Sequence, residues 1–128
     1  MEEHHSFLGW EFIVCKKSDF DAVGKAYEAP ILARWMASLG ADKWIADLAA
    51  AGIATDLGGS GYPNRFTVPA AAVVPILMQG PPKYLGPMVI GDDYVHSGGW
   101  VGDARIDLAG MSALAPTEIL MVEVWDQS

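Results

Sequence analysis

Residues 118–125 read E-I-L-M-V-E-V-W and are apolar on both faces through the middle of the run. A strand at the edge of a sheet, or one with a solvated face, shows a clean alternation of apolar and polar side chains instead. We therefore predict that this segment is a central strand of a sheet. The remaining strands of the chain are then its neighbours.

Further strands are predicted on both sides of the chain's midpoint. Residues 10–15 (W-E-F-I-V-C) are rich in aromatic and β-branched side chains, with Trp10, Phe12 and Val14 on one face. Short strands at 53–57 and 65–68 flank a glycine-rich loop, which indicates a hairpin. The second half contributes four more predicted strands, at 87–90, 94–96, 100–101 and 104–108.

Four helical segments are predicted. One begins at Ser18, whose hydroxyl can cap the first turn with Asp21 as its capping-box partner. The apolar residues of 31–39 recur at helical spacing, and those after Asp42 form a second apolar stripe that ends at Gly52. Residues 69–78 are predicted to be a short buried helix interrupted by Pro75.

These elements predict an α+β domain: a mainly antiparallel sheet with two or three helices from the N-terminal half packed on one face. The chain has 128 residues, near the commonest size of one domain, so 1–128 is predicted to be a single domain with residues 1–8 flexible. With 52% hydrophobic residues it can bury a substantial core. Its one cysteine, Cys15, excludes an internal disulfide.

The negative charge is concentrated in the C-terminal part of the chain. The net charge is −8, and residues 84–128 carry seven acids against one base, Arg105, which is a net of −6. A nucleic-acid-binding protein needs clustered Lys and Arg, so this distribution argues against nucleic acid as a partner. It favours a basic protein partner, because complementary charge speeds encounter. No segment has the length and apolarity of a membrane span and the N-terminus has no signal-peptide pattern, so a cytoplasmic protein is expected.

One stretch, residues 87–107, gathers acidic and aromatic side chains between glycines (P-M-V-I-G-D-D-Y-V-H-S-G-G-W-V-G-D-A-R-I-D). Tyrosine and tryptophan are enriched among interface residues whose loss is costly, and acids around them would pair with Lys or Arg of a partner. A further tyrosine stands in the earlier glycine-rich loop. The predicted partner-binding residues are Asp92, Asp93, Tyr94, His96, Trp100, Asp103, Asp107 and Tyr62.

A catalytic or metal-binding reading of the same stretch is the alternative. Asp92, Asp93 and His96 could hold a divalent ion or act as an acid–base pair. No G-x-S-x-G elbow and no phosphate-binding glycine fingerprint accompanies them. Cys15 lies in an apolar strand, where a thiol is usually a buried small hydrophobe. We therefore predict no catalytic residue, no metal and no cofactor.

The chain resembles the immunity proteins of bacterial contact-dependent and polymorphic toxin systems. The resemblance lies in the M-E-E-H-H-S-F-L-G-W start, the compact length and the acidic, aromatic G-D-D-Y-V-H-S-G-G-W-V-G-D segment, and it covers the whole chain as a type. It implies a cytoplasmic, non-enzymatic protein that binds and neutralises a cognate toxin domain of basic charge, such as a nuclease. The alternatives are a small enzyme or metal- or ligand-binding domain using Asp92, Asp93 and His96, and a subunit of a larger assembly.

Overall fold

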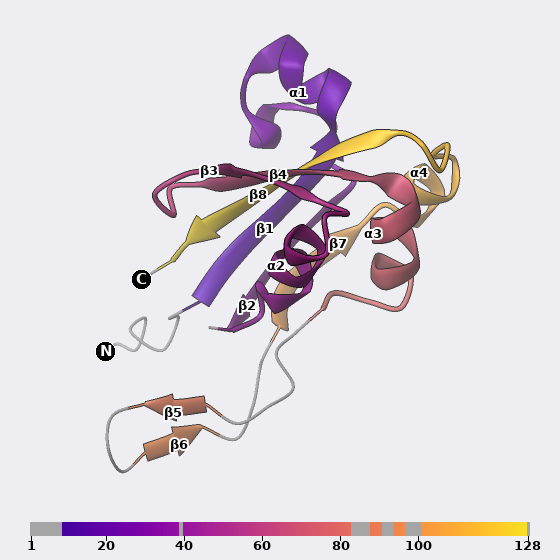
Figure 1. Cartoon of the computed structure of the whole chain (residues 1–128). Helices are drawn as coiled ribbons and strands as arrows, with labels where there is room; N and C mark the ends of the chain where they lie inside the picture. The colour runs from indigo at the N-terminus through magenta and orange to yellow at the C-terminus, as the bar shows by residue number, and fades with distance from the viewer. Residues whose placement is uncertain (1–8, 39, 83–87, 91–93, 97–100, 128) are drawn as a thin grey trace.

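The computed structural model of the chain describes residues 9–38, 40–82, 88–90, 94–96 and 101–127. A six-stranded sheet, antiparallel at every pairing, forms the centre of the molecule, with strand order β3-β4-β8-β1-β2-β7 (Figure 1). The predicted α+β class with an antiparallel sheet is confirmed. In that order the strands span Thr55–Gly58, Asn64–Pro69, Ile119–Asp126, Gly9–Lys16, Ala33–Ser38 and Val101–Ile106.

Helices connect and cover the sheet, and a separate two-stranded sheet lies between α3 and β7 in the sequence. The helical elements are α1 (Lys17–Val23), the 3-10 turn η2 (Ala26–Glu28), α2 (Lys43–Ala50), α3 (Ala70–Leu77) and α4 (Leu108–Ser112). The small sheet pairs β5 (Met88–Ile90) with β6 (Tyr94–His96), and a strand was predicted at each of these places.

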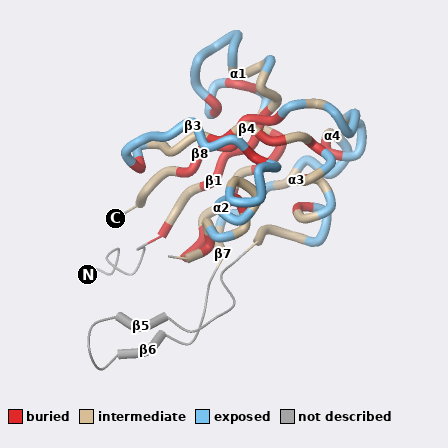
Figure 2. Tube along the Cα trace, in the orientation of Figure 1, coloured by how far each residue is buried: buried red, intermediate tan, exposed pale blue. Residues whose placement is uncertain are grey.

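The predicted central strand is confirmed, because β8 pairs with β4 on one side and β1 on the other. Its side chains are buried on both faces from Leu120 to Val124. In the neighbouring β1, Phe12 and Val14 point into the larger core, while Ile13 and Cys15 point into a smaller one on the opposite face. Figure 2 shows the buried positions concentrated along β1, β4 and β8.

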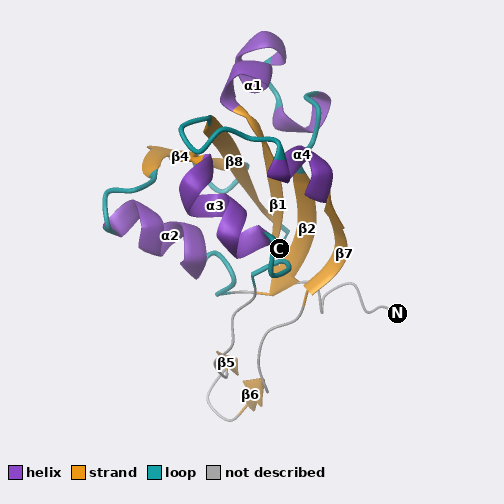
Figure 3. Cartoon of the chain, turned by 90° about the vertical axis from the view of Figure 1, so that its right-hand side faces the viewer, coloured by secondary structure: helices purple, strands orange, loops and turns teal. Residues whose placement is uncertain are grey.

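The two faces of the sheet are covered unequally. Buried side chains of α2, α3 and α4 (Ile45, Val73, Leu77 and Met111) join the larger core on one face; Figure 3 shows α2 and α3 along that face. The helices of this layer therefore come from both halves of the chain. On the opposite face Phe20 of α1 and Ala26 of η2 join the smaller core, over one end of the strands only. Between them these two elements leave part of that face open.

Three aromatic rings centre the larger core. Phe12 stacks on Trp35 with ring centroids 4.8 Å apart, and Trp44 of α2 lies 5.9 Å from Trp35. Trp35 and Trp44 are therefore packing residues, and each such aromatic pair contributes about 1 kcal/mol beyond the effect of burying its surface. The indole N–H groups of Trp10, Trp35 and Trp44 are buried without a hydrogen-bond partner in the described parts of the chain.

The predicted helix at 31–39 is wrong: β2 occupies Ala33–Ser38. Its buried residues are Ala33, Trp35, Ala37 and the last residue, Ser38. The first three recur with a period of two and face the larger core. Met36 and Arg34 point the other way and are half-buried. Because Met36 is apolar on the open side and two core positions are small alanines, the apolar residues imitated a helical stripe.

The helix near Ser18 exists but begins differently. It starts at Lys17, no side chain caps its N-terminus, and Asp21 pairs instead with Lys17 at 2.7 Å. The capping-box prediction is therefore wrong. The helix ends at Gly24, whose positive φ of 79° lets its N–H donate to the Phe20 carbonyl.

Two further boundaries differ from the predictions. The strands expected at 100–101 and 104–108 are one strand, β7, and Leu108 opens α4 with its side chain exposed. The helix expected at 69–78 is present as α3, with Pro69 as its extended N-cap residue and Pro75 inside it. The predicted hairpin around the glycine-rich loop is confirmed as β3 and β4.

Candidate functional site

The open part of the sheet carries a row of charged residues. Strand registers place Arg65 beside Glu123, Ile13 beside both Glu123 and Arg34, and Arg34 beside Arg105. Residues directly opposite one another on antiparallel strands project from the same face. The chain has three arginines, and all three lie in this row.

The first arginine of the row neutralises a buried acid. Glu123 is 0% exposed, and its Oε2 accepts from Arg65 Nε at 2.9 Å while Oε1 accepts from Trp125 Nε1 at 3.1 Å. The Arg65 guanidinium also lies 5.2 Å from the centre of the Phe20 ring. Both carboxylate oxygens are thus satisfied, as a buried charge requires. We interpret this cluster as structural.

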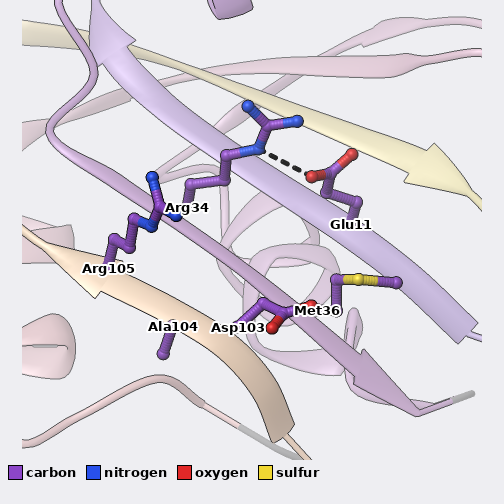
Figure 4. Close-up of a pocket in the computed structure, with 6 residues that line it drawn as sticks. All are labelled: Glu11, Arg34, Met36, Asp103, Ala104 and Arg105. Carbon is purple, nitrogen blue, oxygen red and sulfur yellow. Dashed lines mark hydrogen bonds and ion pairs between the residues drawn. The ribbon is translucent and has the colours of Figure 1, made fainter.

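The second arginine lines a groove. Arg34 Nε donates to Glu11 Oε2 at 2.7 Å. Beside this pair is a groove of about 450 Å³, drawn in Figure 4. Its lining comes from β1, β2 and β7 and consists of Glu11, Arg34, Met36, Asp103, Ala104 and Arg105.

The third arginine stands on the edge strand. Arg105 is exposed, lies directly opposite Arg34, and has no ion pair with any residue that the structure describes. A second groove of about 580 Å³ continues past it along Ile31, Leu32 and Ile106. Arg34 and Arg105 line both grooves, so the two cations stand between them.

Asp103 belongs to the same strand and has an unusual backbone. Its φ is 50°, a left-handed conformation that aspartate tolerates better than most residues. The β2–β7 register shifts between Arg34 and Met36, which marks an irregularity in the ladder opposite this residue. Asp103 is exposed at the edge of the sheet, where such irregularities discourage pairing with another strand.

Tyr62 and Asp103 lie at the same end of the sheet. Gly61 O accepts from Asp126 N at 2.7 Å, and Asp126 is opposite Trp10 near the start of β1. Ala37 is opposite Trp10 on one side and Val101 on the other, so β7 begins at this same end, and Asp103 follows Val101 by two residues. Tyr62 is 59% exposed. The two predicted site residues are four strand spacings apart, about 19 Å.

Asp107 is placed in a different role. It is the N-cap residue of α4, and its Oδ1 accepts from Gly110 N at 2.9 Å. The carboxylate satisfies a helix N–H that would otherwise lack a partner. Asp107 is exposed, but its side chain has this local structural task.

The remaining predicted site residues fall where side chains are not described. Asp92, Asp93 and Trp100 lie outside the described residues, and Tyr94 and His96 belong to β6, of which only the backbone pairing is described. Of the eight predicted residues, the structure thus brings two, Tyr62 and Asp103, to one end of the sheet.

Sequence reasoning missed the arginine row. The signal was present in β7, where Arg105 stands between Ala104 and Ile106 in an alternating pattern. Residues 31–39 were predicted to be a helix, so the strand alternation that places Arg34 on the same face as Arg105 was missed. Two strands with outward arginines would have predicted a cationic face.

The one thiol is unsuited to catalysis in its native position. Cys15 is fully buried, and burial, with smaller contributions from Glu123 and Asp19, raises its pKa to about 12. A thiol in this environment stays protonated at neutral pH.

Among the side chains that the structure describes, no three His, Cys, Asp or Glu residues are grouped to hold a metal ion. No helix within the described ranges is both long and apolar enough to cross a membrane.

Comparison with known proteins adds no assignment to this geometry. No protein-family model, no curated protein and no solved structure matches the chain.

Proposed function

We propose that this chain is a non-enzymatic binding protein of the immunity type, which neutralises a basic cognate toxin domain in the cytoplasm. The docking surface is the end of the sheet that carries Tyr62 and Asp103, together with the acidic segment that precedes β7. The observation that carries the proposal is the placement of these two exposed residues at one end of the sheet.

The size of that end supports a protein partner. A separation of about 19 Å between an aromatic and an acidic contact exceeds the reach of a small ligand and fits an interface of ordinary size. Tyr62 has the apolar body and polar tip that favour interface anchors. Its glycine-rich turn holds it outside the core.

Charge supports a basic partner. The segment with Asp92 and Asp93 precedes β7 in the sequence, and residues 84–128 hold six of the eight net negative charges. Two other acids of this half, Asp107 and Glu123, are engaged in structural contacts. Asp103, by contrast, is exposed at the proposed docking end.

The experiment is coexpression with the candidate toxin. The C-terminal domain encoded by the neighbouring gene is expressed in a bacterial host with and without this chain. Growth arrest by the domain alone, rescue by the chain, and copurification of the two in a complex that weakens with salt are the expected results. An inert neighbouring domain, or rescue without a complex, contradicts the proposal.

A second set of variants tests the part of the surface whose side chains lie outside the described residues. Asp92→Asn with Asp93→Asn and Trp100→Ala should weaken the complex. A divalent-metal titration followed by thermal shift addresses the alternative use of these acids with His96: stabilisation by Mn, Mg, Ca or Zn would favour the metal-binding interpretation over ours.

A further inference from the structure

Strand register sets two like charges, Arg34 and Arg105, directly opposite each other on the open face. Like charges directly opposite each other on neighbouring strands destabilise a sheet. This contact occurs in a protein whose net charge is −8 and which has only eight basic residues. An arrangement that costs stability in the free protein suggests a ligand that relieves it.

Each of the other two arginines already has a carboxylate. Arg65 donates to Glu123, and Arg34 donates through Nε to Glu11. Figure 4 shows the Arg34 guanidinium turned toward Glu11, with Arg105 beside the stem of Arg34. Arg105 thus remains as a guanidinium with no counter-ion among the described residues, in a groove wall with free donors on its planar fork.

Two carboxylates line the groove: Glu11 pairs with Arg34, and Asp103 lies away from the fork of Arg105. Figure 4 places Asp103 beside Met36, at the end of the groove opposite the guanidinium of Arg105. Asp107, which lines the neighbouring groove, is engaged by the backbone of α4. Neither group occupies the donors of Arg105.

We propose that the groove between β1, β2 and β7 binds an oxyanion, a carboxylate or a phosphate group, with Arg105 as the bidentate donor and Arg34 as the second positive charge. A planar guanidinium fork matches both groups. The groove has a volume of about 450 Å³, which admits a small molecule that bears such a group. This site does not rest on the proposed partner surface, which lies at the end of the sheet and depends on acidic residues.

The overall negative charge of the protein disfavours nonspecific binding of anions. A protein with a net charge of −8 repels anions over most of its surface, so saturable anion binding requires a local cationic site. The probes are inorganic phosphate and citrate, added at constant ionic strength to ¹⁵N-labelled protein, with the arginine Nε–H signals followed by NMR. We expect a saturable shift that is largest at Arg105. Saturation by phosphate alone, citrate alone or both assigns the oxyanion.

Variants separate fork recognition from charge. Arg105→Gln should abolish saturation, and Arg105→Lys, which keeps the charge but loses the fork, should weaken binding roughly tenfold. Glu11→Gln releases Arg34 and should strengthen binding several-fold. Lys43→Gln, on the helix-covered side, removes the same charge and should change nothing.

Two results would overturn the inference. One is a linear, non-saturating shift of all three arginines, which is screening by salt. The other is unchanged binding in Arg105→Gln with the fold intact by circular dichroism. Arg105 is exposed, so its replacement should leave the fold in place. Failure of this test leaves the toxin coexpression experiment unaffected, and the reverse also holds.

Discussion

Glu123 is fully buried at the centre of the sheet, and Arg65 on the adjacent strand donates to it at 2.9 Å. The acid is in the interior while the base is 36% exposed at its side chain, so the pair is asymmetric. Removing the base leaves a buried carboxylate whose one remaining side-chain donor, among the described residues, is the Trp125 indole. Removing the acid leaves a base that water can solvate.

We predict that Arg65→Ala lowers the free energy of unfolding by about 3 kcal/mol, because breaking a buried pair strands a charge. Arg105→Ala removes an arginine from the same face that has no ion pair with a described residue, so it should be neutral or slightly stabilising. Urea unfolding followed by tryptophan fluorescence measures both. Equal losses in the two variants would show that the Glu123 contact is not specific.

The buried thiol gives a prediction on pH. The pKa of Cys15 is raised from 9.0 to about 12 in the folded state, so the folded protein retains a proton that the unfolded chain releases above pH 9. Stability therefore falls as the pH rises from about 9 to about 12. The difference between wild type and Cys15→Ala isolates this contribution, since lysines and tyrosines titrate in both. Parallel curves for the two proteins across this range would contradict the raised pKa.

The turn that presents Tyr62 depends on a glycine. At Gly59 φ is 137°, and a Cβ there would collide with the Pro63 carbonyl oxygen. Gly52 also has a positive φ, 78°, but its Cβ would meet nothing within 4 Å. Gly52→Ala should therefore cost about 1–2 kcal/mol from backbone strain alone, and Gly59→Ala more. Thermal unfolding of both variants tests this ordering, and a smaller loss for Gly59→Ala would contradict the described turn.

Asp107 offers a way to separate structure from binding. Asp107→Ala should cost about 1 kcal/mol as a lost N-cap, whereas Asp107→Asn should retain stability because asparagine caps as well. If stability is kept in Asp107→Asn and affinity for the toxin domain also stays, the residue is a cap alone. Loss of affinity in that stable variant would return Asp107 to the partner-binding surface.

Strands with an unambiguous environment were predictable from the sequence. The run around Met121 and Val122 is apolar on both faces because two neighbouring strands and two cores surround it, so its central place followed directly. The β3–β4 hairpin was predictable because its glycines occupy positive-φ positions, such as Gly58 and Gly61, that other residues avoid.

Tertiary context decided the rest. In β2 the alternation of Ala33, Trp35 and Ala37 is weak as a signal because two of the three are alanines, and Met36 lies on the partly open face. Within the candidate site, the sequence predicted only the exposure of residues in glycine-rich loops, such as Tyr62. The arginine row depends on strand register, which has no local signature in the sequence. Register joins Ile13 with Arg34, Arg65 with Glu123, and Arg34 with Arg105, which are 21, 58 and 71 positions apart.

The most direct test of the proposed function is calorimetric titration of the neighbouring gene's basic domain with matched variants of this chain. Tyr62→Ala combined with Asp103→Asn should weaken binding by roughly thirtyfold or more, which is about 2 kcal/mol for interface anchors. Tyr27→Ala combined with Asp47→Asn removes an exposed tyrosine and an exposed acid elsewhere and should bind as the wild type does. Equal affinity of both double variants and the wild type would contradict the docking surface proposed at this end of the sheet.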